Sequence, residues 1–473
     1  MDALFVRRPV PYRKAESFSI LHSGTRKLFL NKDGTRIWQL IDGQSTVRDI
    51  AMRLAGNYDS PEIRDRFLPK VENFLNGLHT WGLVWKSEQG ELKEHRPSTA
   101  PSIEAAPGNP SSGGQPTARP SQEECVTPYL TKEAHTLSEQ IEKLYWERFY
   151  IYKMHLELTY RCNFRCVHCY NPTHGGGRTE MTTSEWERTL SQLAALGCYL
   201  LTFTGGEVFV RKDVIRILEA ACDKGFTFRL NTNGSLIDEK MLMQLEPMRP
   251  FLQSVDISFY GAVPEVHDAL ARKPGSYADT MRAVKLLLEA RMNQVAKFVT
   301  MHDNFHGIGQ FEDDMRALGV PHVVHTGTLI PRTDRDRSPL VQLTSDKQHK
   351  ELIATRGNPN GGEDPGSCRP GHIRGAVTPD GFVSPCEWLT DFKLGNLREQ
   401  TLEEIWHGPE FLSFRKIFEQ ESECPSCDLR TGCSRCPAHS YLETGSLLKC
   451  APNQRHNAEL YRDFVGANAS GGR

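Results

Sequence analysis

The chain has 473 residues, of which 38% are hydrophobic and 25% are charged, and its formal net charge at pH 7 is −2. This length supports two or three folded modules, and the nearly balanced charge provides no attraction to the phosphates of nucleic acid. No apolar run of about eighteen residues predicts a membrane span, and the start MDALFVRRPV lacks the apolar segment of a signal peptide.

The first module, residues 1–89, is predicted to contain short strands and three helices. We expect a strand at Lys27–Leu30 and helices in TRIWQLI, in TVRDIAMRLAG after an N-cap at Thr46, and in IRDRFLPKVENFLNGLHTWGLV. This order predicts a winged-helix-like fold, for which DNA binding is the usual alternative. The second and third helices lack a basic face, because acidic residues are interspersed with the arginines: Asp49, Glu62, Asp65 and Glu72.

The pattern LNKDGTRIWQLIDGQSTVRDIAMRL, followed by GLVW, resembles the PqqD-like peptide-recognition domain. The resemblance implies that this module binds the leader of a ribosomally made precursor peptide as a strand added to its own sheet. A structural appendage with a vestigial groove is the alternative. We expect neither nucleic acid nor a membrane as a partner.

Residues 90–128 are rich in Pro, Ser, Gly and Ala and have no apolar periodicity, which predicts a flexible linker. Such a tether raises the effective concentration of a bound peptide near another module, although an inert joint would have the same composition. A charged helix is expected at Leu130–Tyr150, and it leads into the next module, residues 129–345.

Three cysteines follow a predicted strand, HLELTY, with the spacing C-x3-C-x2-C: Cys162, Cys166 and Cys169. Composition alone predicts only about 0.01 such triplets in this chain. A closed zinc site usually needs two C-x2-C pairs and finds one here, and unrelated core cysteines are the other alternative. Three thiolates on a [4Fe-4S] cluster would leave one iron open for a cofactor.

The next predicted strand, Leu200–Phe203, ends in Thr204, Gly205, Gly206 and Glu207. Paired glycines allow a ligand to approach the backbone closely, and the carboxylate of Glu207 is suited to pair with an ammonium group. A lone GGE is more often an ordinary turn. Here it lies one strand and one helix after the cysteine loop.

Together these two motifs resemble the radical S-adenosylmethionine superfamily. The resemblance implies that Cys162, Cys166 and Cys169 hold a [4Fe-4S] cluster whose open iron binds S-adenosylmethionine. It also implies that Gly205, Gly206 and Glu207 contact this cofactor, and Tyr170, directly after the third cysteine, matches a common family pattern.

Downstream, strands and helices continue to alternate, which predicts an α/β fold with a parallel sheet. Further strands are expected at Thr227–Asn231, Ser254–Phe259, Ala296–Met301 and His322–His325, with helices at Ser184–Leu196, Val214–Lys224, Lys240–Leu245 and Ala278–Ala290. Six strands fit the partial (β/α)6 TIM-like barrel of the family. By the same resemblance, Asn231, Ser258 and Arg272 are expected cofactor contacts, although the first two are also common turn residues and the third also fits a solvated charge.

The last module, residues 346–473, carries seven more cysteines: Cys368, Cys386, Cys424, Cys427, Cys433, Cys436 and Cys450. Taken alone, the C-x2-C-x5-C-x2-C run fits a zinc knuckle. With HIRGAVTPDGFVSPCEW and LGNLREQTLEEIW, the whole pattern resembles the SPASM extension, which holds two auxiliary iron-sulfur clusters, expected to be [4Fe-4S]. Two other cysteines, Cys198 and Cys222, match no cluster pattern and are expected in the core.

The resemblance assigns the auxiliary ligands in two sets. The proximal cluster would take Cys368, Cys386 and Cys436, and the distal cluster would take Cys424, Cys427, Cys433 and Cys450. The last interval of the central run is two residues where many relatives have three, and the proximal set has only three cysteines. Either His372 completes the proximal set or one of its irons is open.

The resemblances imply an enzyme that modifies a ribosomally made precursor peptide through a 5′-deoxyadenosyl radical. A thioether, carbon-carbon or carbon-oxygen crosslink fits the electron-accepting auxiliary clusters best, with epimerisation as an alternative. A sulfatase-type maturase that forms formylglycine would not need a leader-binding module, and a non-catalytic zinc scaffold would not need GGE. We expect a reductant such as flavodoxin or ferredoxin and a cytoplasmic location, since clustered thiolates require a reducing compartment.

Overall fold

The computed structural model describes residues 4–7, 12–14, 18–23, 26–55, 61–80, 83–88, 91–93, 150–169, 179–325, 345–356, 370–419, 424, 426–429, 432–433 and 436–470. Three predicted features lie outside these residues: Tyr170, Cys368, and most of the stretch from the linker to the charged helix. The chain divides into two compact units, Met1–Ile141 and Glu142–Arg473.

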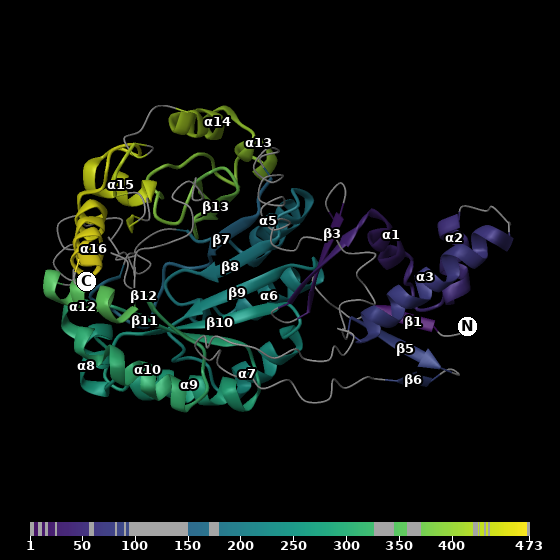
Figure 1. The fold of residues 1–473 in the computed structure, drawn as a ribbon, viewed down its shortest axis with the longest axis horizontal. Coiled ribbons are helices and arrows are strands. Elements are labelled where there is room, and N and C mark those ends of the chain that lie inside the picture. Colours follow the sequence, from purple (N-terminus) through teal and green to yellow (C-terminus); the bar gives the residue numbers. More distant parts are fainter. Residues whose placement is uncertain are drawn as a thin grey trace. The chain divides into compact units, whose positions relative to one another are not determined.

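The first unit, purple to blue in Figure 1, contains two small antiparallel sheets. One sheet has the order β1-β5-β6, with β1 at Leu4–Arg7, β5 at Val84–Glu88 and β6 at Glu91–Lys93. The other has the order β2-β3-β4, with β2 at Tyr12–Lys14, β3 at Phe18–Ser23 and β4 at Arg26–Asn31. The last strand of the first sheet, β6, therefore lies just past residue 89, where the sequence placed the end of the first module.

Three helices complete this unit: α1 at Lys32–Leu40, α2 at Val47–Ala55 and α3 at Pro61–Thr80. Their apolar faces bury one core, in which Trp38, Ile50 and Phe74 are almost inaccessible to solvent. The predicted N-cap is confirmed, because Asp49 N donates to Thr46 Oγ1 (3.2 Å) while Asp49 Oδ2 accepts from Thr46 N (2.8 Å). The prediction that helix continues to residue 84 is wrong, since Val84 already belongs to β5.

The second unit is built on an eight-stranded sheet with the order β12-β11-β10-β9-β8-β7-β13-β14. The six strands β7 to β12 run parallel and confirm the six predicted strands: β7 Lys153–Glu157, β8 Leu200–Thr204, β9 Thr227–Thr232, β10 Leu252–Phe259, β11 Gln294–Val299 and β12 His322–His325. In the described residues the sheet remains open, with β12 and β14 at its edges. This is the partial barrel that the sequence predicted.

Alternation along each strand separates two faces of this sheet. In β7, Met154 and Leu156 join the main apolar core, whereas Lys153, His155 and Glu157 point to the opposite side. The same core takes Leu201 and Phe203 from β8 and the corresponding apolar residues of β9 to β11, together with Cys198, as expected. Helices cover this apolar face.

The helices that follow the barrel strands are α5 Thr183–Ala195, α6 Val214–Asp223, α7 Glu239–Leu245, α8 Pro264–Ala271, α9 Ser276–Glu289 and α10 Ile308–Ala317. Short 3-10 turns lie at Val208–Val210, Glu246–Met248 and His302–Gly307. Figure 1 shows α7 to α10 along one side of strands β9 to β12. The four helices predicted in this region are confirmed, whereas α8 and α10 were not predicted from the sequence.

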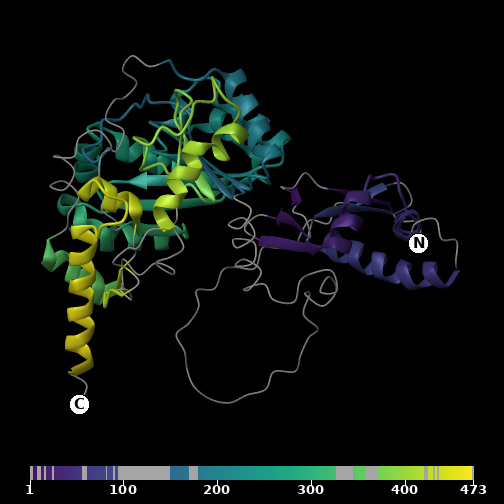
Figure 2. The ribbon, with the colours of Figure 1, turned by 90° about the horizontal axis from the view of Figure 1, so that it is seen from above.

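The C-terminal segment adds two strands to the barrel sheet, β13 at Arg374–Val377 and β14 at Val383–Ser384. They form the predicted hairpin, but β13 also pairs in parallel with β7, with Arg374 opposite Lys153. The remaining helices are α12 Asp346–Arg356, α13 Leu402–Trp406, α14 Pro409–Lys416, α15 Pro437–Thr444 and α16 Pro452–Ser470, with a 3-10 turn at Ile417–Glu419. Figure 2 shows α16 extending away from the sheet to the C-terminus.

Candidate functional site

The cysteine loop follows the carboxyl end of β7 and is anchored at its centre by Phe164, whose side chain is 1% exposed. Phe164 packs in a small apolar cluster that includes Tyr260. Two backbone hydrogen bonds tie the loop to the end of α8: Arg165 N to Ala271 O (3.1 Å) and Val167 N to Leu270 O (3.0 Å). The loop is therefore held on both flanks of its second cysteine.

Cys162, Cys166 and Cys169 are all half-buried. Burial raises the pKa of Cys162 to about 11 and also raises the pKa of Cys166, and the neighbouring thiols add to both effects. In the part of the chain that the structure describes, no three Cys, His, Asp or Glu side chains already converge on a metal position. Because their pKa values are raised, the thiols of Cys162 and Cys166 would need a bound cation to stay deprotonated. The iron of a cluster would act as that cation. Three thiols carried by one partly buried loop fit three ligands of a [4Fe-4S] cluster.

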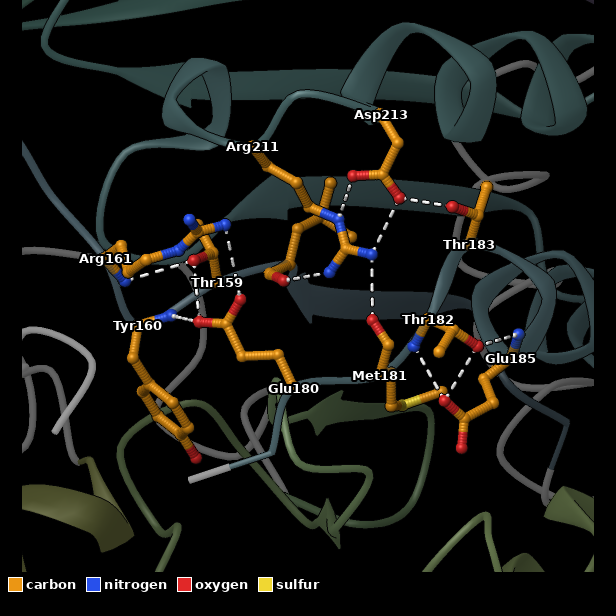
Figure 3. Close-up of polar contacts among 11 residues, drawn as sticks. Thr159, Tyr160, Arg161, Glu180, Met181, Thr182, Thr183, Glu185, Arg211 and Asp213 are labelled. Atoms are coloured by element: carbon orange, nitrogen blue, oxygen red, sulfur yellow. Dashed lines mark hydrogen bonds and ion pairs between the residues drawn. The ribbon is translucent and has the colours of Figure 1, made fainter. Parts of the chain in front are cut away.

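Glu180 links the residues that enter the cysteine loop to the residues that leave it (Figure 3). Its Oε1 accepts from Thr159 Oγ1 (2.7 Å) and from Tyr160 N (2.8 Å). Its Oε2 lies 3.7 Å from Arg161 Nη2. One carboxylate thus fixes the last residues before Cys162.

Arg211 provides a second, more deeply buried link beside it, also drawn in Figure 3. It donates to Leu158 O (2.9 Å) and Met181 O (2.8 Å), and its guanidinium forms two hydrogen bonds with Asp213. Asp213 in turn accepts from Thr183 Oγ1. The planar guanidinium of Arg211 has several N–H donors, so it can bind the carbonyls of two separate segments and the Asp213 carboxylate at once. The single ammonium group of a lysine could not reach all of these acceptors.

The two glycines of GGE lie directly against the backbone that leads into the cysteine loop. Gly206 N donates to Thr159 O (2.7 Å), and Glu207 N donates to Arg161 O (2.9 Å). A Cβ at Gly205 would lie 2.4 Å from Thr159 O, and one at Gly206 would lie 2.2 Å from Arg161 O. Gly205 also has φ 138°, a conformation that disfavours other residues. The ends of β7 and β8 can approach this closely only because both residues are glycine.

Glu207 is 1% exposed and already has three hydrogen-bond donors. Its Oε1 accepts from Phe209 N (3.2 Å) and Thr232 Oγ1 (2.8 Å), and its Oε2 accepts from Asn233 N (2.8 Å). Burial raises the pKa of Glu207, and these hydrogen bonds oppose that rise. The carboxylate therefore joins the end of β8 to the end of β9. Its predicted pairing with an ammonium group remains a prediction.

The three secondary cofactor contacts lie in different surroundings. Asn231 is in β9, and its buried Oδ1 accepts no hydrogen bond from any described residue. Ser258 is half-buried in β10. Arg272 is exposed at the end of α8 with φ 51°, where its backbone N donates to Ala269 O (3.2 Å). Of the three, Asn231 has an unused buried acceptor, which favours contact with a ligand donor.

Sequence reasoning missed a chain of polar contacts that supports the loop from β9. Asn233 Nδ2 donates to Asn163 Oδ1 (2.9 Å), and Asn163 Nδ2 donates to Ser235 Oγ (2.8 Å). Asn231, an expected cofactor contact, lies two residues before Asn233, but nothing in the sequence joined this segment to Asn163. Tyr260 was missed too. Its buried hydroxyl hydrogen-bonds Cys166, and its ring lies 4.6 Å from that of His168.

The C-terminal segment is attached to the base of the cysteine loop. Tyr160 Oη donates to Asp380 Oδ1 (2.7 Å), and Met181 N donates to Pro379 O (2.7 Å). Arg398 Nε donates to Glu185 Oε1 at 2.7 Å, and the pKa of Glu185 falls to about 2 mainly because of this bond. These contacts place the region of Cys386 against the barrel.

The auxiliary-ligand candidates are placed only in part. Cys386 is buried and donates to Glu387 Oε2 (3.3 Å). His372 is buried, with Nδ1 3.4 Å from Pro370 O. The five later cysteines are half-buried and form no disulfides: Cys424, Cys427, Cys433, Cys436 and Cys450. Their division between two clusters remains a prediction, as does the role of His372.

Three family models match the chain. The radical SAM superfamily matches residues 156–318, an iron-sulfur cluster-binding domain named SPASM matches residues 368–428, and coenzyme PQQ synthesis protein D matches residues 19–84. Together the matched ranges contain the cysteine loop, GGE, several C-terminal cysteines and the three N-terminal helices.

Two related proteins each match more than half of this chain. The PqqA peptide cyclase of Granulibacter bethesdensis is 27% identical over 310 residues, which span 60% of this chain and 82% of that protein. The AdoMet-dependent heme synthase of Methanosarcina barkeri is 26% identical over 331 residues, which span 63% of this chain and 94% of that protein.

Two solved structures share the fold. Streptococcus suis SuiB bound to its precursor peptide SuiA has a TM-score of 0.57 and 13% identity, covering 95% of this chain and 99% of SuiB. The protein anSMEcpe with bound AdoMet and a peptide has a TM-score of 0.51 and 16% identity, covering 67% of this chain and 97% of that protein. In the described part of the chain, no helix has both the length and the apolar character needed to cross a bilayer.

Proposed function

Because this chain is a radical S-adenosylmethionine enzyme with a SPASM domain and a PqqD-like domain, we propose that it modifies a ribosomally made precursor peptide. The observation that carries this proposal is the direct contact between the cysteine loop and GGE, through Gly206 N to Thr159 O and Glu207 N to Arg161 O. This contact supports the assignment of both motifs to one cofactor site, because it lies at the ends of neighbouring parallel strands, where α/β enzymes bind their ligands.

In this proposal Cys162, Cys166 and Cys169 hold the cluster, and the backbone at Gly205 and Gly206 lies against S-adenosylmethionine. When bound there, the cluster and cofactor supply a 5′-deoxyadenosyl radical that abstracts hydrogen from the peptide. The protein's contribution is positioning. Glu180 and Arg211 fix the entry and exit of the loop, and Glu207 holds the ends of β8 and β9 together.

The auxiliary clusters would accept the electron left on the product, and a small electron-transfer protein such as flavodoxin or ferredoxin would reduce the first cluster. We propose that the first unit binds the leader of the precursor as an added strand, because both of its small sheets have open edges in the described residues. The described edge strands are short, so recognition would need side-chain pockets as well as backbone hydrogen bonds.

Anaerobic reconstitution tests the enzyme. We expect about twelve iron atoms per chain, from three [4Fe-4S] clusters, and 5′-deoxyadenosine after reduction with S-adenosylmethionine. Bound zinc without 5′-deoxyadenosine would instead identify a non-catalytic scaffold. The variant Cys222→Ala is a matched control, because this cysteine packs against the apolar core and belongs to no cluster pattern.

Co-expression with a short precursor gene beside this one tests the reaction. A crosslink removes two hydrogens from the peptide mass, whereas epimerisation leaves the mass unchanged but incorporates deuterium from solvent. Formylglycine would appear as a change confined to one cysteine or serine. We expect the loss of two hydrogens and a requirement for the first unit, which a truncation after the linker would remove.

A further inference from the structure

The barrel sheet carries a charged face on the side opposite its apolar core. We call it the polar face; its charged or ionisable members on the parallel strands include Lys153, His155, Glu157, Arg229, Asp256 and Lys297. These positions alternate with core residues such as Met154 and Leu156, so they point away from the covering helices. Charged groups on a half-buried face are costly unless they are paired or receive a ligand.

Most charges of this face have partners. Lys297 Nζ lies 2.6 Å from Asp256 Oδ2, and Ser254 Oγ donates to the other oxygen of that carboxylate (2.6 Å). Arg229 Nε donates to Gln253 Oε1 (2.6 Å), and this neutral partner does not offset the positive charge of the guanidinium.

Lys153 is different, because its ammonium group has no hydrogen bond or ion pair with any described residue. Burial lowers the pKa of Lys153, and of the charges around it only Glu387 opposes this effect, whereas Arg374, Arg229 and Lys297 reinforce it. Arg374 is its direct neighbour across the β7–β13 pair. An additional anion at this place would lower the electrostatic cost of burying the Lys153 ammonium group beside these cations.

We propose that Lys153 binds a carboxylate of the peptide substrate, the side chain of an aspartate or glutamate several residues away from the one that reacts. The inference rests on the proposed function, and it names an acidic residue as a determinant of substrate choice. Arg374 and Arg229 supply positive potential around the carboxylate, and Lys153 supplies the hydrogen-bond donors.

The position of Lys153 along the strand indicates which residue of the peptide it reads. Lys153 begins β7, whereas Thr159 lies beyond the strand's other end, against GGE. Six residues of extended chain span about 20 Å. In an extended peptide, a carboxylate at Lys153 therefore belongs to a residue about six positions from the reacting one. Lys153 acts as a specificity residue and not as a catalytic one.

A second source of negative charge exists, since Cys386 precedes Glu387 and an auxiliary cluster with thiolate ligands is anionic. The experiment separates the two sources by measuring peptide kinetics and cluster potential in the same variants. These are Lys153→Gln, Lys153→Glu and, as a matched control, Lys285→Gln on the exposed face of α9.

With a precursor found by the co-expression experiment, we expect Lys153→Gln to lower kcat/KM for peptide modification roughly 10- to 100-fold, mainly through KM, and Lys285→Gln to leave it unchanged. Replacing one acidic residue of the peptide by its amide should cause the same loss. When the amide-substituted peptide is tested with Lys153→Gln, kcat/KM should fall little further than with either change alone, because both changes remove the same interaction. A peptide with lysine at that position should recover part of the lost kcat/KM with Lys153→Glu, because the two charges are then exchanged.

If no precursor is modified, the proposed function fails but the site is still tested. The probe is then the α-amide of N-acetylglutamate against that of N-acetylglutamine, titrated into the reconstituted enzyme by calorimetry. Tighter binding of the glutamate compound to wild type, lost in Lys153→Gln, supports the inference. Equal binding of both compounds, or unchanged peptide kinetics with a more negative auxiliary-cluster potential in Lys153→Gln, overturns it.

Discussion

Replacing Gly206 by alanine is the sharpest test of how the two motifs are joined. The added Cβ would lie 2.2 Å from Arg161 O, where ordinary contact needs about 3.4 Å, so the end of β8 must move away by about 1 Å. That shift lengthens Gly206 N to Thr159 O and Glu207 N to Arg161 O, now 2.7 and 2.9 Å, beyond hydrogen-bond range. Two lost bonds in a buried setting cost about 2 to 4 kcal/mol.

We expect Gly206→Ala to unfold at lower urea concentration and to lose both iron from the first cluster and 5′-deoxyadenosine formation. The control is Gly309→Ala, in the first turn of α10, where an added Cβ meets nothing within 4 Å. This control should be unchanged or more stable by up to about 1 kcal/mol, because alanine is the better helix former. If Gly206→Ala had the same urea midpoint and the same iron content as the wild type, the steric explanation would be refuted.

Three further changes test neighbouring parts of the site. Cys162→Ala should remove about four iron atoms per chain and abolish 5′-deoxyadenosine formation, measured by iron analysis and chromatography; retained cleavage would contradict its role as a ligand. Tyr260→Phe removes the hydroxyl that contacts a loop thiol and should make the first cluster's potential more negative in a redox titration followed by electron paramagnetic resonance, since hydrogen bonds to sulfur favour the reduced state. Asp380→Ala removes the acceptor of Tyr160 Oη and should lower the free energy of unfolding by about 1 to 3 kcal/mol in urea titration; an unchanged value would mean that this contact does not hold the C-terminal segment in place.

Most elements of this protein and the motifs of its candidate site could be predicted from the sequence, although α8 and α10 were not. Apolar periodicity placed all six parallel strands and four of their helices, because each strand must bury one face and each helix one stripe. The spacing of Cys162, Cys166 and Cys169 and the paired glycines identified the chemistry, since these features depend on residue type at short range.

How these pieces support one another follows from the tertiary fold and could not be read from local patterns. The carboxylate of Glu207 faces the end of β9, Glu180 connects the two ends of the cysteine loop, and Lys153 stands beside Arg374 from a strand more than 200 residues later. Such partnerships depend on which chain segments the sheet brings side by side. A local sequence pattern does not encode the order of strands in the sheet. The C-terminal hairpin would have the same local pattern if it folded apart from the barrel.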